Sequence, residues 1–246
     1  MKELIIFDLD GTLAESKMPM DREMSDLLRK LLRRKKVAVI SGGAYAQFEK
    51  QFLESLDCPP DLLKNLYLFP TCATSFYRHE DGWKNVYEER LSPEERDRIL
   101  AAFDEALKET GFVPLDRPFG EVIENRGTQI TFSALGQNAP IELKRGWDPD
   151  FSRRKRIKSA LEKRVPEFEI RMGGSTSIDV TRKGIDKAYA ISKIEEQTGI
   201  SRAGMLFIGD ALFEGGNDYP VKATGVECIQ VSGPAKTKEV IRSLLA

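Results

Sequence analysis

A β-strand, a helix and a second β-strand succeed one another in the first forty residues, and this order constrains the fold more than any other feature of the chain. Residues 4–7 (Leu-Ile-Ile-Phe) and 37–40 (Val-Ala-Val-Ile) are continuous apolar runs, which are typical of strands buried on both faces of a parallel sheet. Between them, residues 21–36 carry leucine and methionine at helical spacing. Ligands of such strand–helix–strand units gather at the carboxyl ends of the strands. We therefore expect Asp8 and Ser41, which stand at these two ends, along one edge of the sheet.

The stretch from residue 84 to residue 183 has a different pattern. A capping box with the sequence Ser-Pro-Glu-Glu at residues 92–95 predicts a helix that ends near Gly111, and a second helix is predicted at residues 149–164. Alternation of polar and apolar residues predicts strands at residues 121–124, 129–133, 168–171 and 177–180. Helices set apart from antiparallel strands indicate an α+β domain inserted into the α/β one.

After residue 184 the pattern of buried strands returns. Strands are predicted at residues 205–208 and 228–231, and helices at residues 186–197 and 237–244. We therefore predict an α/β fold with a discontinuous, Rossmann-like core. Residues 1–83 and 184–246 would form this parallel-sheet core, and residues 84–183 the inserted α+β domain.

The chain contains a single histidine, His79, in a polar stretch where we expect a solvated loop. A Ser-His-Asp triad, a Cys-His pair or a multi-histidine zinc site would each depend on that one residue, and no Gly-x-Ser-x-Gly or Cys-x-x-Cys motif accompanies it. The three cysteines are widely spaced, and we expect them to be reduced. The chemistry must therefore rest on carboxylates, lysine, hydroxyls or a hard metal ion.

Charge and hydropathy argue against several classes of partner. A net charge of −1 gives no reason to expect nucleic acid, and no apolar run approaches the ~20 residues of a membrane-spanning helix. Residues 1–8 show no signal-peptide pattern, so we expect a cytoplasmic protein. The basic cluster at residues 153–156 could attract an anion or nucleic acid. We interpret it instead as the solvated face of a helix that buries Phe151, Ile157 and Leu161.

The segment Asp8-Leu9-Asp10-Gly11-Thr12, directly after the first strand, carries the strongest chemical signal. Two carboxylates this close repel each other, and a cation that neutralises them makes the arrangement tolerable. Mg²⁺ is commonly held by one or two carboxylates together with phosphate oxygens. With an ordinary carboxyl pKa of about 3.9, Asp8 would be ionised at neutral pH and able to attack an electrophile. The alternative is a strand-terminal turn that is merely rich in Asp and Gly.

Three further segments agree with a phosphate site. Ser41-Gly42-Gly43 opens onto a helix that starts near Ala44, so a hydroxyl and backbone N–H groups would face the crevice; the alternative is an ordinary helix cap. Gly209-Asp210 ends the third apolar strand, and residues 214–218 add oxygen-bearing side chains, or else form a surface turn. Lys187 lies early in a helix, where it is either solvated or able to hold a phosphate as a point charge.

Taken in order, these four segments resemble the haloacid dehalogenase (HAD) superfamily of phosphotransferases. The inserted α+β domain resembles the C2B cap of its subfamily IIB. Gly215-Gly216-Asn217-Asp218 and residues 173–180 resemble the phosphomannomutase branch in particular. The resemblance covers the whole chain and implies an enzyme with Mg²⁺ as cofactor and a phosphorylated sugar as substrate. It also implies a homodimer formed through the caps.

The resemblance implies a role for each matching core residue. Asp8 would be the nucleophile that becomes an aspartyl-phosphate, and Asp10 would give a proton to the leaving oxygen and later take one from the acceptor. The transferring phosphoryl group would be bound by Thr12, Ser41, Gly42 and Lys187. The metal would be held by Asp8, the backbone carbonyl of Asp10 and Asp210, with Asn217 and Asp218 in support.

In the cap, the resemblance assigns the substrate's distal phosphate and sugar hydroxyls to Arg126, Ser177 and Asp179. One departure concerns Gln137, because the mutases carry a second arginine there, after a glycine. This departure removes a full positive charge, for which Lys144 or Arg145 could compensate.

Three functions stay open at this point. The first is a phosphohydrolase or phosphotransferase acting on a phosphorylated sugar through an aspartyl-phosphate, which the missing arginine favours. The second is a phosphomannomutase that interconverts mannose 6-phosphate and mannose 1-phosphate. The third is a non-catalytic sugar-phosphate-binding module, which the full set of motif carboxylates disfavours.

Overall fold

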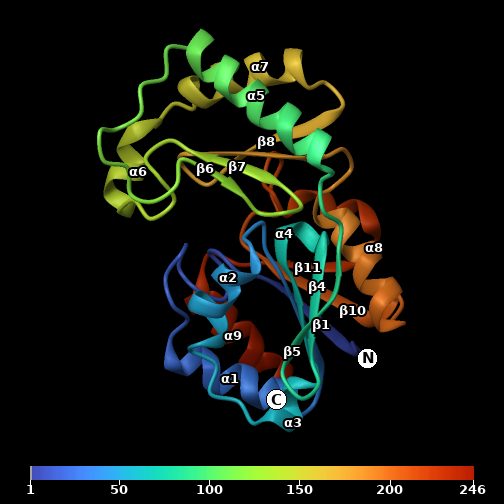
Figure 1. Ribbon diagram of the computed structural model, residues 1–246. Helices are drawn as coiled ribbons and strands as arrows, with labels where there is room; N and C mark the ends of the chain where they lie inside the picture. Colours follow the sequence, from blue (N-terminus) through green and yellow to red (C-terminus); the bar gives the residue numbers. More distant parts are fainter. Residues whose placement is uncertain (1) are drawn as a thin grey trace. The chain divides into compact units, whose positions relative to one another are not determined.

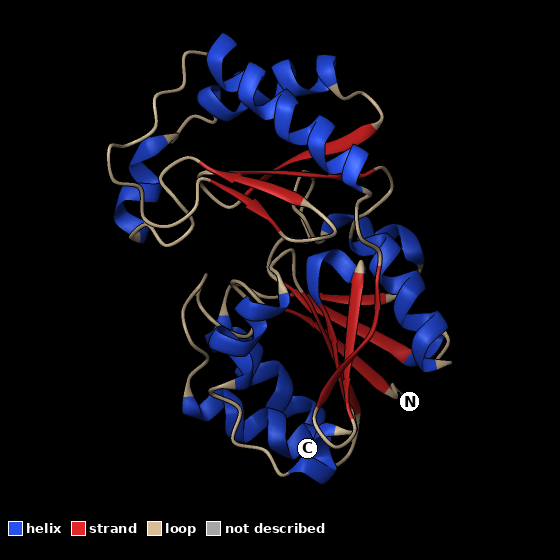
Figure 2. Ribbon diagram, viewed as in Figure 1, coloured by secondary structure: helices blue, strands red, loops and turns tan. Residues whose placement is uncertain are grey.

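A computed structural model describes residues 2–246 as two compact units (Figures 1 and 2). The first unit, here called the core, comprises the residues up to Glu88 together with Ile185–Ala246. The second, the cap, comprises Glu89–Gly184. The predicted α/β core with an α+β insert is confirmed. The predicted start of the insert, at residue 84, instead falls inside a strand of the core sheet.

The core is built on one seven-stranded sheet with the order β11-β10-β1-β2-β3-β4-β5. The strands are β1 (Leu4–Asp8), β2 (Lys36–Ile40), β3 (Leu66–Phe69), β4 (Ser75–His79), β5 (Trp83–Glu88), β10 (Met205–Gly209) and β11 (Glu227–Gln230). The first five strands in this order pair in parallel, whereas β4 and β5 form an antiparallel hairpin at the edge. In the centre, β1 lies between β10 and β2, with Phe7 opposite Ile208 on one side and Val39 on the other.

Helices cover both faces of the core sheet, and this explains the unbroken apolar runs. Ile5 and Phe7 pack in one cluster with α1 (Arg22–Leu32) and α9 (Pro234–Leu245). Leu4 and Ile6, which point to the other face, pack with α8 (Lys187–Thr198). Alternate residues of the same strand thus serve two different hydrophobic layers, as expected for a strand inside a parallel sheet.

Short elements follow β2 and shape the loop at its carboxyl end. They are α2 (Tyr45–Phe48), a π-helix (Glu49–Leu53), α3 (Pro60–Leu63) and α4 (Pro70–Ala73). Within α4, Thr71, Cys72 and Ala73 all have positive φ values, between 48° and 65°. The backbone N–H of Cys72 donates to the carbonyl of Ser41 at 2.9 Å, and that of Thr71 to the carbonyl of Gly43 at 2.9 Å. A left-handed turn, which is costly for residues other than glycine, therefore supports the Ser41 loop.

The cap contains a four-stranded antiparallel sheet with the order β6-β7-β9-β8. Its elements are α5 (Pro93–Glu109), β6 (Ile123–Asn125), β7 (Ile130–Ser133), α6 (Ile141–Trp147), α7 (Ser152–Arg164), β8 (Phe168–Gly173) and β9 (Ser177–Arg182). Ile130, Phe132, Ile178 and Val180 form a core with residues of α5 and α7. Residues at alternate positions of β7 and β9, including Thr131 and Asp179, belong to the opposite, polar face of the sheet. The predicted capping box is present at Ser92 and Glu95.

The basic cluster of α7 differs from the prediction at one residue. Arg154 is 1% exposed and forms an ion pair with the buried Asp148 at 2.7 Å, while Phe151 is 48% exposed. One amino group of Arg154 also donates to the carbonyls of Gly173 and Gly174, at 3.2 Å and 2.7 Å. The arginine therefore takes the buried position predicted for the phenylalanine, because its guanidinium connects the start of α7 to the turn between β8 and β9.

Replacing Arg154 by methionine is expected to destabilise the cap by about 3–5 kcal/mol. The substitution leaves the Asp148 carboxylate buried with no cation beside it, which costs more than the intact pair contributes. Urea denaturation followed by circular dichroism measures the loss, and Lys155→Met, at the exposed neighbouring position of α7, provides the matched control. Equal stabilities for the two variants would contradict this account of Arg154.

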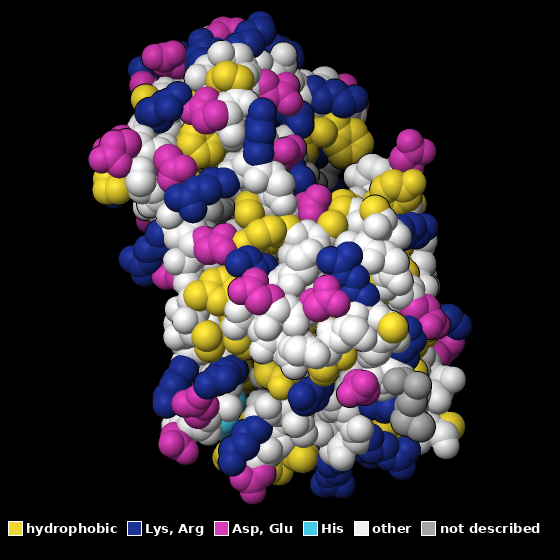
Figure 3. Space-filling model, turned by 90° about the vertical axis from the view of Figure 1, so that its right-hand side faces the viewer, with side chains coloured by type: hydrophobic (Ala, Val, Ile, Leu, Met, Phe, Trp, Pro, Cys, Tyr) yellow, Lys and Arg dark blue, Asp and Glu magenta, His cyan; other side chains and the backbone are white. Residues whose placement is uncertain are grey.

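Other predictions can be placed on the structure. His79 is not in a solvated loop, since it ends β4, is half-buried and packs edge-on against Trp83. All three cysteines are free, as predicted. Basic and acidic side chains are interspersed on the face shown in Figure 3. Among residues 2–246, no helix combines the length and the apolar character that crossing a membrane requires.

Candidate functional site

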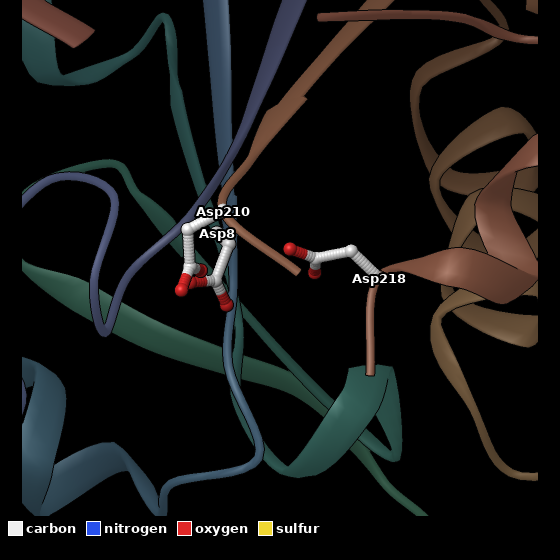
Figure 4. A group of neighbouring side chains, drawn as sticks. All are labelled: Asp8, Asp210 and Asp218. Carbon is white, nitrogen blue, oxygen red and sulfur yellow. The ribbon is translucent and has the colours of Figure 1, made fainter. Parts of the chain in front are cut away.

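Three carboxylates meet at the carboxyl edge of the core sheet (Figure 4). Asp8 ends β1, and Asp210 follows β10, the parallel neighbour of β1. Asp218 precedes a 3-10 helix (Tyr219–Thr224), and its carboxylate points toward the other two. One oxygen of each residue lies within 4.8 Å of the others. The structure thus brings together three residues that are up to 210 positions apart in the sequence.

Lys187 is the cation of this cluster. It is the first residue of α8, whose N-cap is Asp186, and it is 1% exposed rather than solvated. Its ammonium Nζ donates to Asp8 Oδ1 at 2.5 Å and also to the carboxylate of Asp218. One lysine facing three carboxylates leaves an excess of negative charge when all are ionised. An all-oxygen donor set with this excess suits a hard divalent cation such as Mg²⁺.

Burial changes the protonation of these groups. Desolvation raises the pKa of Asp8 to about 7, although the charge of Lys187 opposes the shift. Desolvation also raises the pKa of Asp210 above its usual range, and the nearby charge of Asp218 adds to this. For Lys187, burial alone would lower the pKa, but the charges of Asp8 and Asp218 outweigh it and hold the pKa above its usual range. Burial thus raises the pKa of Asp8 above the ordinary carboxyl value that its residue type alone predicts.

Gly11 and Thr12 connect the loop after β1 to Asp210. Gly11 has a φ of +83°, and a Cβ at this position would lie 2.6 Å from Asp210 Oδ2. Both the backbone conformation and the close approach of the carboxylate therefore require glycine. The hydroxyl of Thr12, predicted to bind phosphate, is buried and donates to Asp210 Oδ1 at 3.3 Å.

The remaining predicted core residues lie around this cluster in different environments. Ser41 is buried, and its hydroxyl accepts a hydrogen bond from the backbone N–H of Gly43 at 3.0 Å. Gly42 is partly exposed beside it. Asn217 is exposed in the loop before Asp218. Of the predicted metal ligands, the structure thus gathers the carboxylates of Asp8, Asp210 and Asp218.

The carboxylate of Asp10 has partners that sequence reasoning missed. Both of its oxygens accept hydrogen bonds from glutamine side chains, Gln47 at 2.8 Å and Gln51 at 3.0 Å. The two glutamines lie 37 and 41 residues after Asp10. Their only local signal is a spacing of four residues shortly after the Ser41 loop, and such a spacing does not identify a partner.

Two of the predicted cap residues, Ser177 and Asp179, lie on the polar face of the cap sheet. Asp179 accepts hydrogen bonds from Thr131 at 2.7 Å and from Gln129 at 3.1 Å, two residues that we had not singled out. The hydroxyl of Ser177 lies 3.1 Å from that of Ser133. These contacts link β7 and β9 on the same face.

Arg126 and Gln137 belong to other parts of the cap. Arg126 is largely buried and forms an ion pair with Glu124 at 2.7 Å, so part of its charge is already balanced. Gln137 lies in the loop after β7. Lys144 and Arg145 are the two residues that could compensate for the missing arginine. Of these, Lys144 lies beside Gln137, and its Nζ donates to the backbone carbonyl of Gln137 at 2.7 Å.

Comparison with known proteins identifies a family that most of this chain matches. Residues 24–246 match the family described as eukaryotic phosphomannomutase. The phosphomannomutase of Encephalitozoon cuniculi (strain GB-M1) is 29% identical over 248 residues, which cover 96% of this chain and 91% of that protein. The phosphomannomutase of Saccharomyces cerevisiae (strain ATCC 204508 / S288c) is 29% identical over 224 residues, which cover 89% of this chain and 84% of the relative.

Solved structures agree on the fold. A haloacid dehalogenase-like hydrolase from Bacteroides thetaiotaomicron superimposes with a TM-score of 0.69 at 16% identity and covers 99% of this chain and 100% of its own. An ATP-bound IMP-nucleotidase from Plasmodium falciparum reaches a TM-score of 0.76, also at 16% identity. This chain spans 60% of the length of that nucleotidase. At these identities the likeness concerns the fold alone.

Proposed function

Because the chain belongs to the eukaryotic phosphomannomutase family, we propose that it is a sugar-phosphate mutase that interconverts mannose 6-phosphate and mannose 1-phosphate. The observation that carries the proposal is a buried Asp8 that pairs with Lys187 and lies beside Asp210 and Asp218, in a chain that matches this family over residues 24–246. The predicted resemblance to the HAD superfamily and to its phosphomannomutase branch is confirmed.

In the proposed reaction, a carboxylate oxygen of Asp8 attacks one phosphorus of a sugar bisphosphate, while the other phosphate stays on the sugar. A bond forms between this oxygen and phosphorus while the bond from phosphorus to the sugar oxygen breaks, and Asp10 gives a proton to the leaving oxygen. The reverse step transfers the phosphoryl group to the free hydroxyl of a sugar monophosphate, whose proton returns to Asp10, and this regenerates the bisphosphate. Lys187, with Ser41 and Gly42 at the neighbouring strand end, would bind the phosphoryl oxygens during both steps.

Mg²⁺ is the proposed cofactor, held by Asp8, Asp210 and Asp218 with the carbonyl of Asp10. The chemistry that it supplies when bound is charge neutralisation, which lets a carboxylate approach a phosphate of the same sign. Asn217 and Thr12 would support the site from its edge. The proposed homodimer, and the expected lack of membrane and nucleic-acid partners, stay predictions.

A second candidate is a sugar-phosphate hydrolase, and Gln137 is the observation that favours it. A mutase must hold the phosphate that is not reacting, and Gln137 offers no charge where the resemblance leads us to expect arginine. With Lys144 beside Gln137 the deficit is reduced, and the relatives named above are phosphomannomutases. These two observations favour the mutase over the hydrolase, which the missing arginine alone had favoured.

Incubation of the protein with mannose 1-phosphate, Mg²⁺ and a catalytic amount of a sugar bisphosphate distinguishes the candidates. Formation of mannose 6-phosphate without loss of organic phosphate is the expected result. Release of inorganic phosphate would identify the hydrolase, and binding without turnover the non-catalytic module. Undiminished activity in the presence of EDTA would contradict the metal assignment.

Stabilisation by Mg²⁺ is expected to depend on pH. In the metal-free protein Asp8 has a pKa of about 7, so below that pH the folded state keeps a proton that the unfolded chain releases near pH 4. The stability of the metal-free protein therefore falls as the pH rises between these values. Because the metal competes with this proton, its apparent affinity at pH 8 should exceed that at pH 6 by roughly tenfold.

Isothermal titration with Mg²⁺ at the two pH values measures this difference. Asp8→Asn is the control, because it removes the titrating carboxyl and should make the remaining affinity much less dependent on pH. Equal affinities of the unaltered protein at pH 6 and pH 8 would show that Asp8 does not exchange a proton for the metal.

A further inference from the structure

Both oxygens of the Asp10 carboxylate are held by side-chain amides from a single helical segment. The amide Nε2 of Gln47 donates to Oδ2 at 2.8 Å, and that of Gln51 donates to Oδ1 at 3.0 Å. The backbone N–H of Lys17 donates to Oδ1 as well, at 2.7 Å. These donors come from two different segments, so together they restrict rotation of the carboxylate about its side-chain bonds.

The two glutamines also hold each other. Nε2 of Gln47 donates a second hydrogen bond, to Oε1 of Gln51 at 2.8 Å. Nε2 of Gln51 donates a second one to the carbonyl of Glu15 at 3.4 Å. The side chain of Gln51 is buried, with 3% exposure. Its amide makes three hydrogen bonds, with Asp10, Gln47 and the carbonyl of Glu15. A buried amide with its hydrogen bonds satisfied has a defined orientation and can impose that orientation on its partner.

Gln47 and Gln51 lie four residues apart on one continuous helical segment, so both side chains can reach the same carboxylate. Gln47 lies in α2, which continues directly into the π-helix Glu49–Leu53 that carries Gln51. Phe48 and Phe52 of the same segment are fully buried in the core cluster and fix it in place. π-helical turns are rare and frequently occur at functional sites.

Gly43 provides the space that Gln47 needs. A Cβ on Gly43 would lie 2.1 Å from Oε1 of Gln47, well inside the closest approach of real atoms. The Gln47 amide therefore lies against the bare backbone of the Ser41 loop. A side chain at residue 43 would have to displace this amide, and with it one donor to Asp10.

From this geometry we propose that Gln47 and Gln51 are positioning residues that orient Asp10 for proton transfer to the leaving sugar oxygen. The inference rests on the proposed function, because it assumes that Asp10 carries this proton. Neither glutamine exchanges a proton itself. Their contribution is to keep the Asp10 carboxyl directed at the oxygen whose bond to phosphorus breaks, and such alignment sets the efficiency of a general acid.

Two substrates with different leaving groups test the proposal. Release of a sugar hydroxyl from a mannose bisphosphate needs a proton, whereas p-nitrophenolate leaves p-nitrophenyl phosphate without one. In first-turnover measurements with Mg²⁺, Gln47→Met should slow sugar release about 100-fold while changing KM less than threefold. Release of p-nitrophenolate should stay within about threefold of the unaltered protein. Gln51→Met should show the same contrast.

Glu49→Met is the matched control, because it introduces the same side chain at an exposed position of the same segment. Gly43→Ala should reproduce the Gln47→Met pattern, and adding it to Gln47→Met should cause little further loss, since both changes remove one interaction. Gln47 is partly exposed, so its variant should fold even if the variant of the buried Gln51 does not.

The outcomes are separable. Equal slowing of both substrates, or an unchanged rate of sugar release in Gln47→Met, would overturn the positioning role and leave the proposed function standing. If the unaltered protein turns over neither of the two substrates and does not interconvert the mannose phosphates, the proposed function is wrong, and the inference is wrong with it.

Discussion

Asp8→Asn is expected to lower phosphoryl transfer by a factor on the order of 10⁴ or more, the size of effect seen when a nucleophile is removed. The amide has nearly the shape of the carboxyl group but is a far weaker nucleophile, so no aspartyl-phosphate should form. Because Lys187 keeps Asp218 as an ionic partner, the fold should survive. Rapid quenching with labelled substrate, followed by detection of acid-stable, base-labile phosphate on the protein, measures the intermediate directly.

Asp104→Asn is the matched control for this loss. Asp104 lies on α5 in the cap, is exposed and pairs with Lys108, so the same chemical change there should leave the rate within about twofold. A labelled intermediate that persists in Asp8→Asn would show that another residue accepts the phosphoryl group, and the assignment of Asp8 would then fail.

Lys187→Met is expected to destabilise the metal-free protein by about 3–5 kcal/mol, because it leaves the buried carboxylates of Asp8 and Asp218 without their cation. Mg²⁺ should restore a large part of this loss, since a divalent ion can neutralise the same carboxylates. Activity should nevertheless stay low with Mg²⁺ present, because the transferring phosphoryl group would lack the lysine's hydrogen bonds.

Denaturation in urea, with EDTA or with Mg²⁺, separates these two effects. Lys236→Met is the control, since Lys236 lies exposed on α9 and pairs only with Glu239 among the ion pairs identified in residues 2–246. If Lys187→Met lost stability equally with and without Mg²⁺, the metal and the lysine would not share the carboxylates, and the proposed metal site would be in doubt.

The centre of the fold was predictable because its strands are buried on both faces. Leu4–Phe7, Val37–Ile40 and Met205–Ile208 are unbroken apolar runs, and each lies in a strand of the sheet. The hairpin of β4 and β5 was missed. It lies at the sheet edge, where β5 in particular is largely accessible to solvent and its sequence is mainly polar. The boundary that we predicted at residue 84 lies inside β5.

From the sequence, the site could be predicted only as far as which strand ends carry its residues. Parallel topology fixes which strand ends share an edge, so Asp8 and Asp210 could be expected together from sequence. The pKa of Asp8 and the burial of Lys187 depend on all the residues packed around them. No local sequence pattern encodes these residues. Gln51 contacts Asp10 from a π-helix, and the sequence around residue 50 shows no sign that a regular helix would widen there.

The insertion of the cap between β5 and α8 has a consequence for how the molecule is made. Asp8 and Lys187 are 179 residues apart, and β10, the strand that pairs with one edge of β1, is translated only after the whole cap. At ~5–20 residues per second, the nascent chain carries an apolar strand with an open edge for on the order of ten seconds or more. During that interval Asp8 has no ammonium partner, so a ribosome-bound fragment that ends before residue 187 should need a chaperone and should be inert toward phosphate esters.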